Sequence, residues 1–320
     1  MVIEMDTPSN EQPRFKPGAG SSARKTAFLR NEWFRAFLLA LVVLVALHAF
    51  VFRFVSVQST SMYATLKPGD LLLVLRWSAW AGLDRGDVVV FRDPLKDRDP
   101  MRKRPLLVKR VAAGPGDVLQ VKRGHLVVNG EVQAPQPGIT MSYLIRVKDS
   151  GEVVADEILR SLQLPKELAI RDRGNIEVPL NAVLAKEVEK DPMVISADPM
   201  RLATGSRRHL FPFSPRYAWN GDDYGPISVP RKGDTLHINV DNFPLYDRLM
   251  SVYEGHTLGV NGNTMLLDGS PLTNYVVEQD YYFVLGDCRH YSADSRYWGF
   301  LPADHVVGRG VLIHSGNGVD

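Results

Sequence analysis

The sequence predicts a mainly β protein: an antiparallel, barrel-like core with an inserted second β-rich domain, preceded by one N-terminal transmembrane helix. Three observations lead to this fold class. Short apolar runs rich in β-branched residues recur along most of the chain, Gly-Asp turns separate many of them, and one long apolar run lies near the N-terminus. Such runs between turn residues are typical of antiparallel strands.

The predicted strands lie at 71–75, 88–91, 106–111, 118–121, 126–128, 236–240, 281–285 and 306–313. Pro-Gly-Asp turns at 68–70 and 115–117 directly precede two of these strands and mark where they begin. One segment, 152–164, instead places Val154, Ile158 and Leu162 at helical spacing and predicts a surface helix.

A predicted membrane anchor occupies residues 30–54. Residues 36–52 are apolar except for His48 and are bracketed by Arg35 and Arg53, and seventeen residues is the short end of the range for a membrane span. A cleavable signal peptide is the alternative, but a long polar stretch precedes the run and no clean Ala-x-Ala site follows. Basic residues concentrate before the run, so residues 1–29 are predicted to be a disordered cytoplasmic tail.

Composition excludes several classes of function. The formal charge of +2 gives no basic excess of the kind that would indicate a nucleic-acid partner, and we predict none. Cys288 is the single cysteine, so no internal disulfide and no cysteine-rich metal site can form. The histidines are scattered without ligand spacing, and we predict no metal and no cofactor.

Chemistry is suggested by a serine and a lysine in apolar surroundings. Ser59 and Ser61 follow the anchor and would share one face of an extended strand with Val55 and Val57. Alone, such serines are typical of a solvated strand end. Lys109 lies in the apolar strand 106–111, where burial would lower its pKa and provide a free amine as a base. A Ser–Lys pair can activate a hydroxyl without histidine.

With the segment 286–299 included, the chain resembles a bacterial type I signal peptidase, also called leader peptidase. The matching motifs are Ser59-x-Ser61-Met62 with 65–66, then 86–91, then Lys109-Arg110 before 116–117, and then the segment from Gly286. The resemblance implies a membrane-anchored serine endopeptidase. Such an enzyme removes N-terminal signal peptides from exported preproteins and cleaves after small residues at positions −1 and −3.

The resemblance also implies the role of each site residue. Ser61 is the nucleophile and Lys109 the general base, while the Ser59 hydroxyl and the Ser61 backbone N–H form the oxyanion hole. Ser292 orients the lysine, and Asp294 with Arg296 forms a supporting ion pair. The residues that match substrate-pocket positions are Val55, Val57, Met62, Leu66, Leu107 and Val108. Their alternative interpretation is ordinary core.

The implied organisation is a catalytic core at 55–128 and 280–314, an inserted domain at 129–279, and a C-terminal tail at 315–320. The enzyme would lie in the inner (plasma) membrane with its catalytic domain on the periplasmic side, and its partners would be signal peptides and the lipid bilayer. Residues 77–83, with Trp77 and Trp80, predict either a surface that dips into the bilayer or a core hairpin.

Some positions depart from the family pattern, and other functions remain open. Ala64 stands where proline is usual, and Cys288 and Tyr291 stand where asparagine is usual, which puts local turn hydrogen bonds in doubt. Cys288 with His290 would suggest a cysteine peptidase, although residues two apart rarely pair in this way. The remaining alternatives are a specialised peptidase for pilin or conjugation precursors, a LexA-like self-cleaving repressor, and an inactive membrane-anchored binding module.

Overall fold

The structure is a computed structural model that describes residues 32–134, 136, 138–149, 151–205, 210–262 and 264–315. The predicted tail at 1–29 and all but Ser315 of the predicted C-terminal tail lie outside the described residues. The chain divides into two compact units, Met1–Ala49 and Phe50–Asp320.

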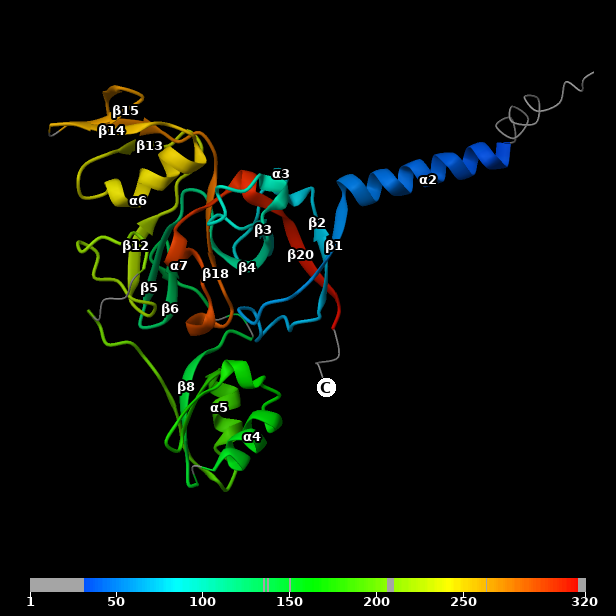
Figure 1. Cartoon of the computed structure of the whole chain (residues 1–320), viewed down its shortest axis with the longest axis vertical. Helices are drawn as coiled ribbons and strands as arrows, with labels where there is room; N and C mark the ends of the chain where they lie inside the picture. The colour runs from blue at the N-terminus through cyan, green and yellow to red at the C-terminus, as the bar shows by residue number, and fades with distance from the viewer. Residues whose placement is uncertain are drawn as a thin grey trace, which may run out of the picture. The chain divides into compact units, whose positions relative to one another are not determined.

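The first unit contributes the helix α2 (Glu32–Phe50), which covers most of the predicted anchor (Figure 1). Its described apolar side chains from Phe37 to Val45 are largely exposed. Within the part of the chain that the structure describes, we find no helix with the length and apolar character needed to cross a membrane. The membrane anchor therefore stays a prediction.

The second unit is built on a curled, seven-stranded antiparallel sheet (Figure 1). Strands from both ends of the unit meet in it, because the C-terminal strand β20 inserts between β2 and β3. In spatial order the strands are β1 (Phe52–Ser56), β2 (Leu71–Leu75), β20 (Val306–His314), β3 (Val88–Arg92), β4 (Leu106–Ala113), β18 (Tyr281–Leu285) and β19 (Leu301–Pro302).

The second unit also contains three smaller sheets and two short helices next to the seven-stranded sheet. The first sheet is β12 (Tyr224–Ser228), β5 (Val118–Lys122), β6 (His125–Val128) and β7 (Glu131–Val132). The second pairs β13 (Thr235–His237) with β17 (Asn274–Val276), and the third contains β14 (Leu258–Asn261), β15 (Thr264–Leu267) and β16 (Ser270–Pro271). The helices are α3 (Ser78–Ala81) and α6 (Phe243–Arg248).

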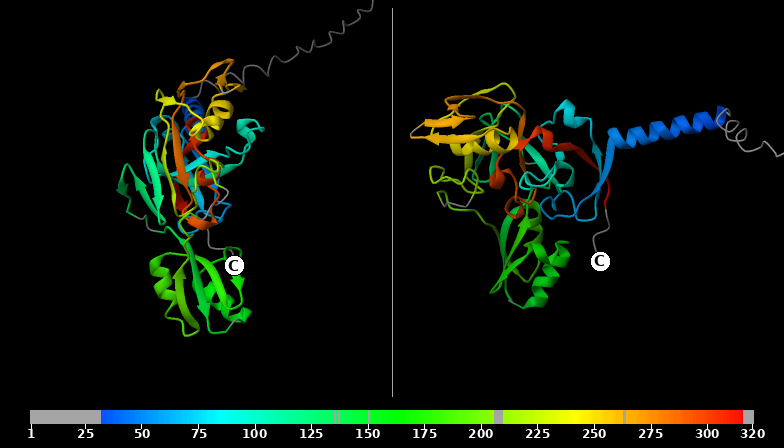
Figure 2. Two further views of the ribbon diagram at one scale, coloured as in Figure 1. Left: turned by 90° about the vertical axis from the view of Figure 1, so that its left-hand side faces the viewer. Right: turned by 45° about the horizontal axis from the view of Figure 1, so that its top comes forward.

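Residues 141–199 form a body with its own sheet and its own apolar core (Figure 2). The sheet order is β11 (Val194–Pro199), β8 (Met141–Val147), β10 (Asn175–Leu180) and β9 (Ile170–Asp172). The helices α4 (Glu152–Ser161) and α5 (Ala182–Val188) contribute Ile158, Leu159 and Val188 to its core. We call this body the α/β insert. The predicted boundaries of the inserted domain at 129–279 stay a prediction.

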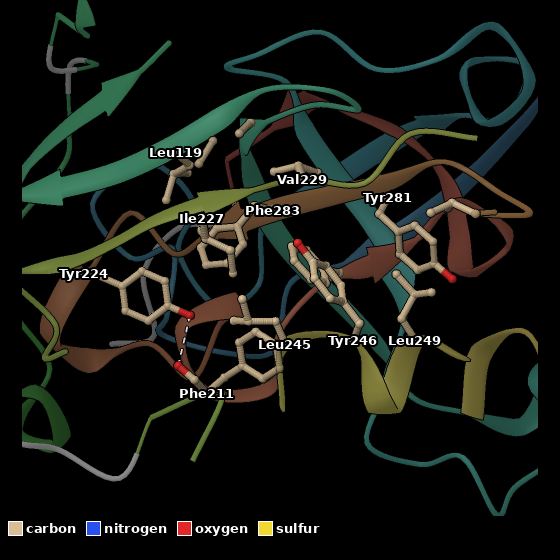
Figure 3. Close-up of a cluster of buried hydrophobic side chains, with 14 of the residues drawn as sticks. Leu119, Phe211, Tyr224, Ile227, Val229, Leu245, Tyr246, Leu249, Tyr281 and Phe283 are labelled. Carbon is tan, nitrogen blue, oxygen red and sulfur yellow. Dashed lines mark hydrogen bonds between the residues drawn. The ribbon is translucent and has the colours of Figure 1, made fainter. Parts of the chain in front are cut away.

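A second apolar core lies beneath β5, β12 and β18 and is rich in aromatic rings (Figure 3). Phe283 of β18 and Tyr224 of β12 pack in a tilted arrangement, with 5.7 Å between ring centroids. The buried Tyr224 hydroxyl donates to the Phe211 carbonyl at 3.1 Å. This bond gives the polar end of the buried side chain a hydrogen-bond partner. Because β18 belongs to the large sheet, this core also fixes the segment that follows β18.

Most predicted strands are confirmed, and two predictions need correction. The run at 236–240 forms only β13, because the Asn239 side chain accepts from the backbone N–H groups of Asp241 and Asn242 and turns the chain. The surface helix at 152–164 is confirmed as α4 but ends at Ser161. Trp77 precedes α3 and Trp80 lies within it. Their exposed fractions are 49% and 76%, so residues 77–83 do not form the core hairpin that was one of the two predictions.

Candidate active site

Ser61 lies in a turn that follows β1. The strand ends at Ser56, so the extended conformation does not continue to Ser61, and the Tyr63 N–H donates to the Thr60 carbonyl at 2.9 Å. The Thr65 and Leu66 N–H groups both donate to the Met62 carbonyl, so the turn closes although Ala64 replaces proline. Ser61 is 8% exposed.

This turn is attached to the chain beyond β18. The Cys288 N–H donates to the Ser61 carbonyl at 3.0 Å, and the Asp287 N–H lies 3.3 Å from the Met62 sulfur. Residues separated by more than two hundred positions are thereby held side by side. The position of Ser61 depends on the segment from Gly286 to Arg296.

Lys109 lies in β4, between two neighbouring strands of the large sheet, and is 3% exposed. Its Nζ donates to Ser61 Oγ at 2.6 Å and to the Val108 carbonyl at 3.0 Å. Burial lowers the pKa of the Lys109 amine from its usual 10.5, and the carboxylates of Asp294 and Asp287 oppose this shift only in part. The neutral amine is therefore accessible at lower pH than in an ordinary lysine.

The Ser59 hydroxyl lies beside the pair formed by Ser61 and Lys109. Ser59 Oγ lies 3.1 Å from Ser61 Oγ, and Ser59 is exposed where Ser61 is buried. A hydroxyl here can donate to an oxyanion that develops next to Ser61 Oγ. The structure brings Ser59, Ser61 and Lys109 together as the sequence predicts.

Ser292 stands next to this cluster, against Gly286. Its buried Oγ makes no hydrogen bond to any described residue, so its role in orienting the lysine stays a prediction. The segment is packed so tightly here that a Cβ on Gly286 would lie 2.1 Å from Ser292 Oγ and 2.8 Å from the Ser61 carbonyl oxygen. Glycine is required at this position by space.

Asp294 and Arg296 form a buried, two-point ion pair at the start of α7 (Ser295–Trp298). Arg296 Nε and Nη2 donate to the two Asp294 oxygens at 2.9 and 2.8 Å. Asp294 also accepts from the Gly286 N–H at 3.0 Å and is fully buried. Burial alone would raise the pKa of the Asp294 carboxyl, but the charge of Arg296 outweighs it and the pKa is lowered.

A second buried ion pair, for which the sequence motifs predict no role, joins Arg110 to Asp287. Arg110 Nε and Nη2 donate to the two Asp287 oxygens at 2.9 and 2.6 Å, and Thr65 Oγ1 donates to Asp287 at 2.5 Å. Both residues lie inside the motifs that contain Lys109 and Ser292. Their pairing joins β4, the Ser61 turn and the segment after β18.

Five of the six predicted pocket residues lie in one apolar cluster. Val57, Met62, Leu66 and Val108 are buried together, and Val55 packs against them half-buried. Leu107 instead packs with Phe91 in a different cluster. Successive strand residues point to opposite faces, so Leu107 and Val108 cannot share one pocket through their side chains.

Cys288 and His290 do not form a catalytic pair. Cys288 is buried, its Sγ accepts from Thr140 Oγ1 at 3.3 Å, and burial raises the pKa of its thiol. The His290 ring lies 2.8 Å from Asp222 and accepts from the Ser142 N–H. A thiol held in its protonated form is a poor nucleophile, so this site has no cysteine-peptidase chemistry. Among the described residues, no group of three or more His, Cys, Asp or Glu side chains is arranged to hold a metal ion.

The mainly β fold and the buried contact between a lysine amine and a serine hydroxyl fit a serine hydrolase that works without histidine. The family model described as signal peptidase, peptidase S26, matches residues 30–167 and 226–315. The chain therefore belongs to this family and is a serine endopeptidase.

Individual relatives agree with the family assignment. The chain is 35% identical over 101 residues to Signal peptidase I of Bacillus licheniformis, a match that covers 31% of this chain and 50% of that protein. It is 23% identical to Signal peptidase I of Buchnera aphidicola over 88% of this chain and 76% of that one. With Signal peptidase I of Haemophilus influenzae the identity is 22%, over 88% of this chain and 69% of that one.

Proposed function

We propose that this chain removes N-terminal signal peptides from exported preproteins, with Ser61 as nucleophile and Lys109 as general base. The observation that carries the proposal is the 2.6 Å contact between Lys109 Nζ and Ser61 Oγ in a buried setting that lowers the pKa of the lysine. The names of the relatives supply the class of substrate.

The geometry supports a two-step acyl transfer. The neutral Lys109 amine takes the Ser61 hydroxyl proton as Oγ attacks the scissile carbonyl, and the resulting ammonium gives that proton to the leaving amine. The signal peptide then remains as an ester on Ser61. Water attacks this ester, with Lys109 again accepting the proton, and the peptide acid leaves with Ser61 Oγ reprotonated.

Charge that develops on the carbonyl oxygen needs donors close to Ser61. The Ser59 hydroxyl, 3.1 Å from Ser61 Oγ, and the Ser61 backbone N–H are the groups that we propose for this role. Removing one donor of this kind usually costs about a hundredfold or more in rate. Ser59→Ala should thus lower kcat more than it raises KM.

Small residues at the −1 and −3 positions of the substrate fit the apolar cluster of Val55, Val57, Met62, Leu66 and Val108. Most of these side chains are buried, which leaves room for only shallow contact. Leu107 packs elsewhere, so we propose it as part of the fold and not of the pocket.

Membrane attachment belongs to the same proposal. The apolar segment in α2, the basic residues before it, and the exposed indoles of Trp77 and Trp80 support an enzyme at the plasma membrane with its catalytic unit on the periplasmic side. Substrates anchored by their own signal peptides would meet the site at the membrane surface.

The test is cleavage of a preprotein with an Ala-x-Ala site by the detergent-solubilised chain and by its Ser61→Ala and Lys109→Ala variants. We expect the unaltered chain to cut after the second alanine, and both variants to stay folded and inactive. Cleavage by Ser61→Ala would disprove the assignment of the nucleophile. An inert unaltered chain, unlabelled at Ser61 by a serine-directed inhibitor, would favour the inactive binding module.

A further inference from the structure

A cavity of about 590 Å³ lies apart from the dyad, between the α/β insert and the strands β4 and β6. Ser59, Ser61 and Lys109 are not among its lining residues. Its volume falls in the usual range for sites that bind small molecules, roughly 300–1,000 Å³. The active-site chemistry described above makes no use of it.

The lining of this cavity is cationic. It contains four arginines and one histidine, and no Asp or Glu stands among its described residues. The arginines are Arg85, Arg110, Arg201 and Arg289, and the histidine is His125. A concave surface with charges of one sign concentrates ligands of the opposite sign.

Arg289 is the buried arginine of this group that makes no ion pair with any described residue. It is 8% exposed, and its buried Nε has no hydrogen-bond partner among the described residues. Unlike Arg110 and Arg296, it makes no ion pair within that part of the chain. Burial together with the charge of Arg296 lowers the pKa of Arg289 to about 10, so the guanidinium still carries its charge at neutral pH.

The two carboxylates that influence Arg289 are already engaged by other groups. Asp287 accepts from Arg110 and Thr65, and Asp294 accepts from Arg296 and the Gly286 N–H. Three arginines thus share two carboxylates, and one buried positive charge remains. A buried charge without a partner is costly, and a bound anion would offset that cost.

Apolar side chains cover much of the remaining wall. Leu126, Ile139, Leu180 and Leu285 line the cavity beside the arginines. Arginine binds carboxylate and phosphate groups through two parallel hydrogen bonds, whereas the apolar wall suits a short carbon chain.

We propose that this cavity binds a phosphate group carried on a small, partly apolar molecule, with Arg289 as its principal anchor. The phosphate can come from a phospholipid head group or from a free phosphate ester. Both sources present the same anionic group to Arg289, and they differ in whether the ligand is membrane-bound.

The experiment is calorimetric titration of the detergent-solubilised full chain at constant ionic strength. One arm uses glycerol phosphate, and the other uses mixed micelles of short-chain phosphatidate, with phosphatidylcholine micelles as the neutral reference. We expect saturable one-site binding of at least one phosphate probe. Glycerol phosphate binding would identify a free ester as sufficient, and binding of phosphatidate alone would identify a lipid head group.

Two variants and one control connect the binding to this cavity. Arg289→Met keeps the volume but removes the charge, and we expect at least a tenfold weaker Kd. Gln136→Glu changes an exposed lining residue, adds negative charge at the cavity, and should also weaken binding without threatening the fold. Arg216→Gln removes one charge from an exposed site outside the cavity and should leave Kd unchanged.

Absence of saturable binding by both phosphate probes would overturn the proposal. Equal Kd values for the unaltered chain, Arg289→Met and Gln136→Glu would also overturn it, because the anion would then bind elsewhere. Should Arg289→Met fail to fold, the comparison of Gln136→Glu with Arg216→Gln still decides the outcome.

Discussion

At the scale of single residues, the proposed role of Lys109 as general base makes its burial decisive for the pH dependence that we expect of the enzyme. Desolvation disfavours the ammonium form, and the nearby carboxylates of Asp294 and Asp287 stabilise it. The lowering of the pKa shows that desolvation is the larger effect. A lysine base is active only when neutral, so the protonated fraction is the inactive fraction.

This balance predicts the direction of the pH–rate profile. Because the pKa of Lys109 is lowered below 10.5, kcat should fall as pH drops through that folded-state pKa, by about tenfold per pH unit below it. Lys109→Arg should be inactive at every pH, since a guanidinium does not deprotonate in this range. Steady-state cleavage of a soluble peptide measures both effects. An acid optimum, or an active Lys109→Arg variant, would contradict a lysine base.

Gly286 offers a second prediction at this scale. A Cβ at this position would lie 2.1 Å from Ser292 Oγ and 2.8 Å from the Ser61 carbonyl oxygen, so Gly286→Ala must displace one or both groups. A displacement of about 1 Å at a catalytic group can cost on the order of a hundredfold in rate, and we expect kcat to fall by that amount. Peptide cleavage measures it, with circular dichroism to verify the fold.

Gly259→Ala provides the matched control for that substitution. There the nearest atom to an added Cβ is on Leu266 at 3.7 Å, an ordinary contact far from the dyad. This variant should keep full activity. If Gly286→Ala is as active as Gly259→Ala, the tight packing around Ser292 does not position the nucleophile.

The sequence identified the members of the site better than it identified their contacts. The structure brings together Ser59, Ser61 and Lys109, as predicted. The sequence could identify them because the motifs that contain them are short and occur in a fixed order along the chain. The pairing of Arg110 with Asp287 joins residues 177 positions apart, and no local pattern encodes a contact of that length. The family motif predicts one pocket for Leu107 and Val108, although strand alternation places their side chains in different clusters.

At the scale of elements, the start of α7 and the end of β18 are joined by one carboxylate. Asp294 accepts from the Arg296 N–H at the N-terminus of α7 and from the Gly286 N–H just after β18. Its partner Arg296 also donates to the Gly221 carbonyl at 3.1 Å. Three segments therefore depend on one buried ion pair.

Asp294→Asn should therefore destabilise the fold strongly. Removing one partner of a buried pair leaves the other charge uncompensated, at a cost of about 3–5 kcal/mol in the free energy of unfolding. Because the folded pKa of Asp294 is depressed below 3.8, its stabilisation is complete above that value and is lost as pH falls through the folded pKa. The difference in free energy of unfolding between the unaltered chain and Asp294→Asn should therefore shrink in acid.

Chemical denaturation at pH values above and below the folded-state pKa of Asp294 measures this free-energy difference. Asp241→Asn is the control variant. Asp241 pairs with Arg216 on the surface with 72% of its side chain exposed, so its loss should cost less than about 1 kcal/mol. Equal costs for the two variants would show that the Asp294–Arg296 pair does not hold these elements together.

Element prediction worked best where turns marked the strands. The strands β2 and β18 match the predicted runs residue for residue, because each is a continuous apolar run between turns. The sequence pattern does not mark the strands of the α/β insert, since β8 mixes buried and exposed residues without strict alternation and β9 is fully exposed. Their pairing across one sheet, and not their local pattern, defines them.

At the scale of the whole molecule, the chain consists of two compact units to which the proposed function assigns different roles. The dyad, its two ion pairs and the apolar cluster all lie within Phe50–Asp320. The described part of Met1–Ala49 contributes none of these groups and presents a helix with exposed apolar side chains. The proposed function therefore assigns chemistry to one unit and location to the other.

This division predicts that membrane attachment can be lost without loss of chemistry. Leu41→Asp combined with Val45→Lys places two charges in α2, each costing about 2.5–3.5 kcal/mol if the helix lies at the centre of a bilayer. The doubly substituted chain should move from the membrane pellet to the aqueous fraction. Its kcat on a short soluble peptide should equal that of the unaltered chain, whereas cleavage of a membrane-inserted preprotein should fall.

The control is Val260→Asp with Ile195→Lys, which adds the same charges at exposed apolar positions of the second unit. It should change neither the distribution between membrane and aqueous fractions nor the activity. If the α2 variant still sediments with membranes, α2 is not the anchor, and the exposed Trp77 and Trp80 become the next candidates for membrane contact.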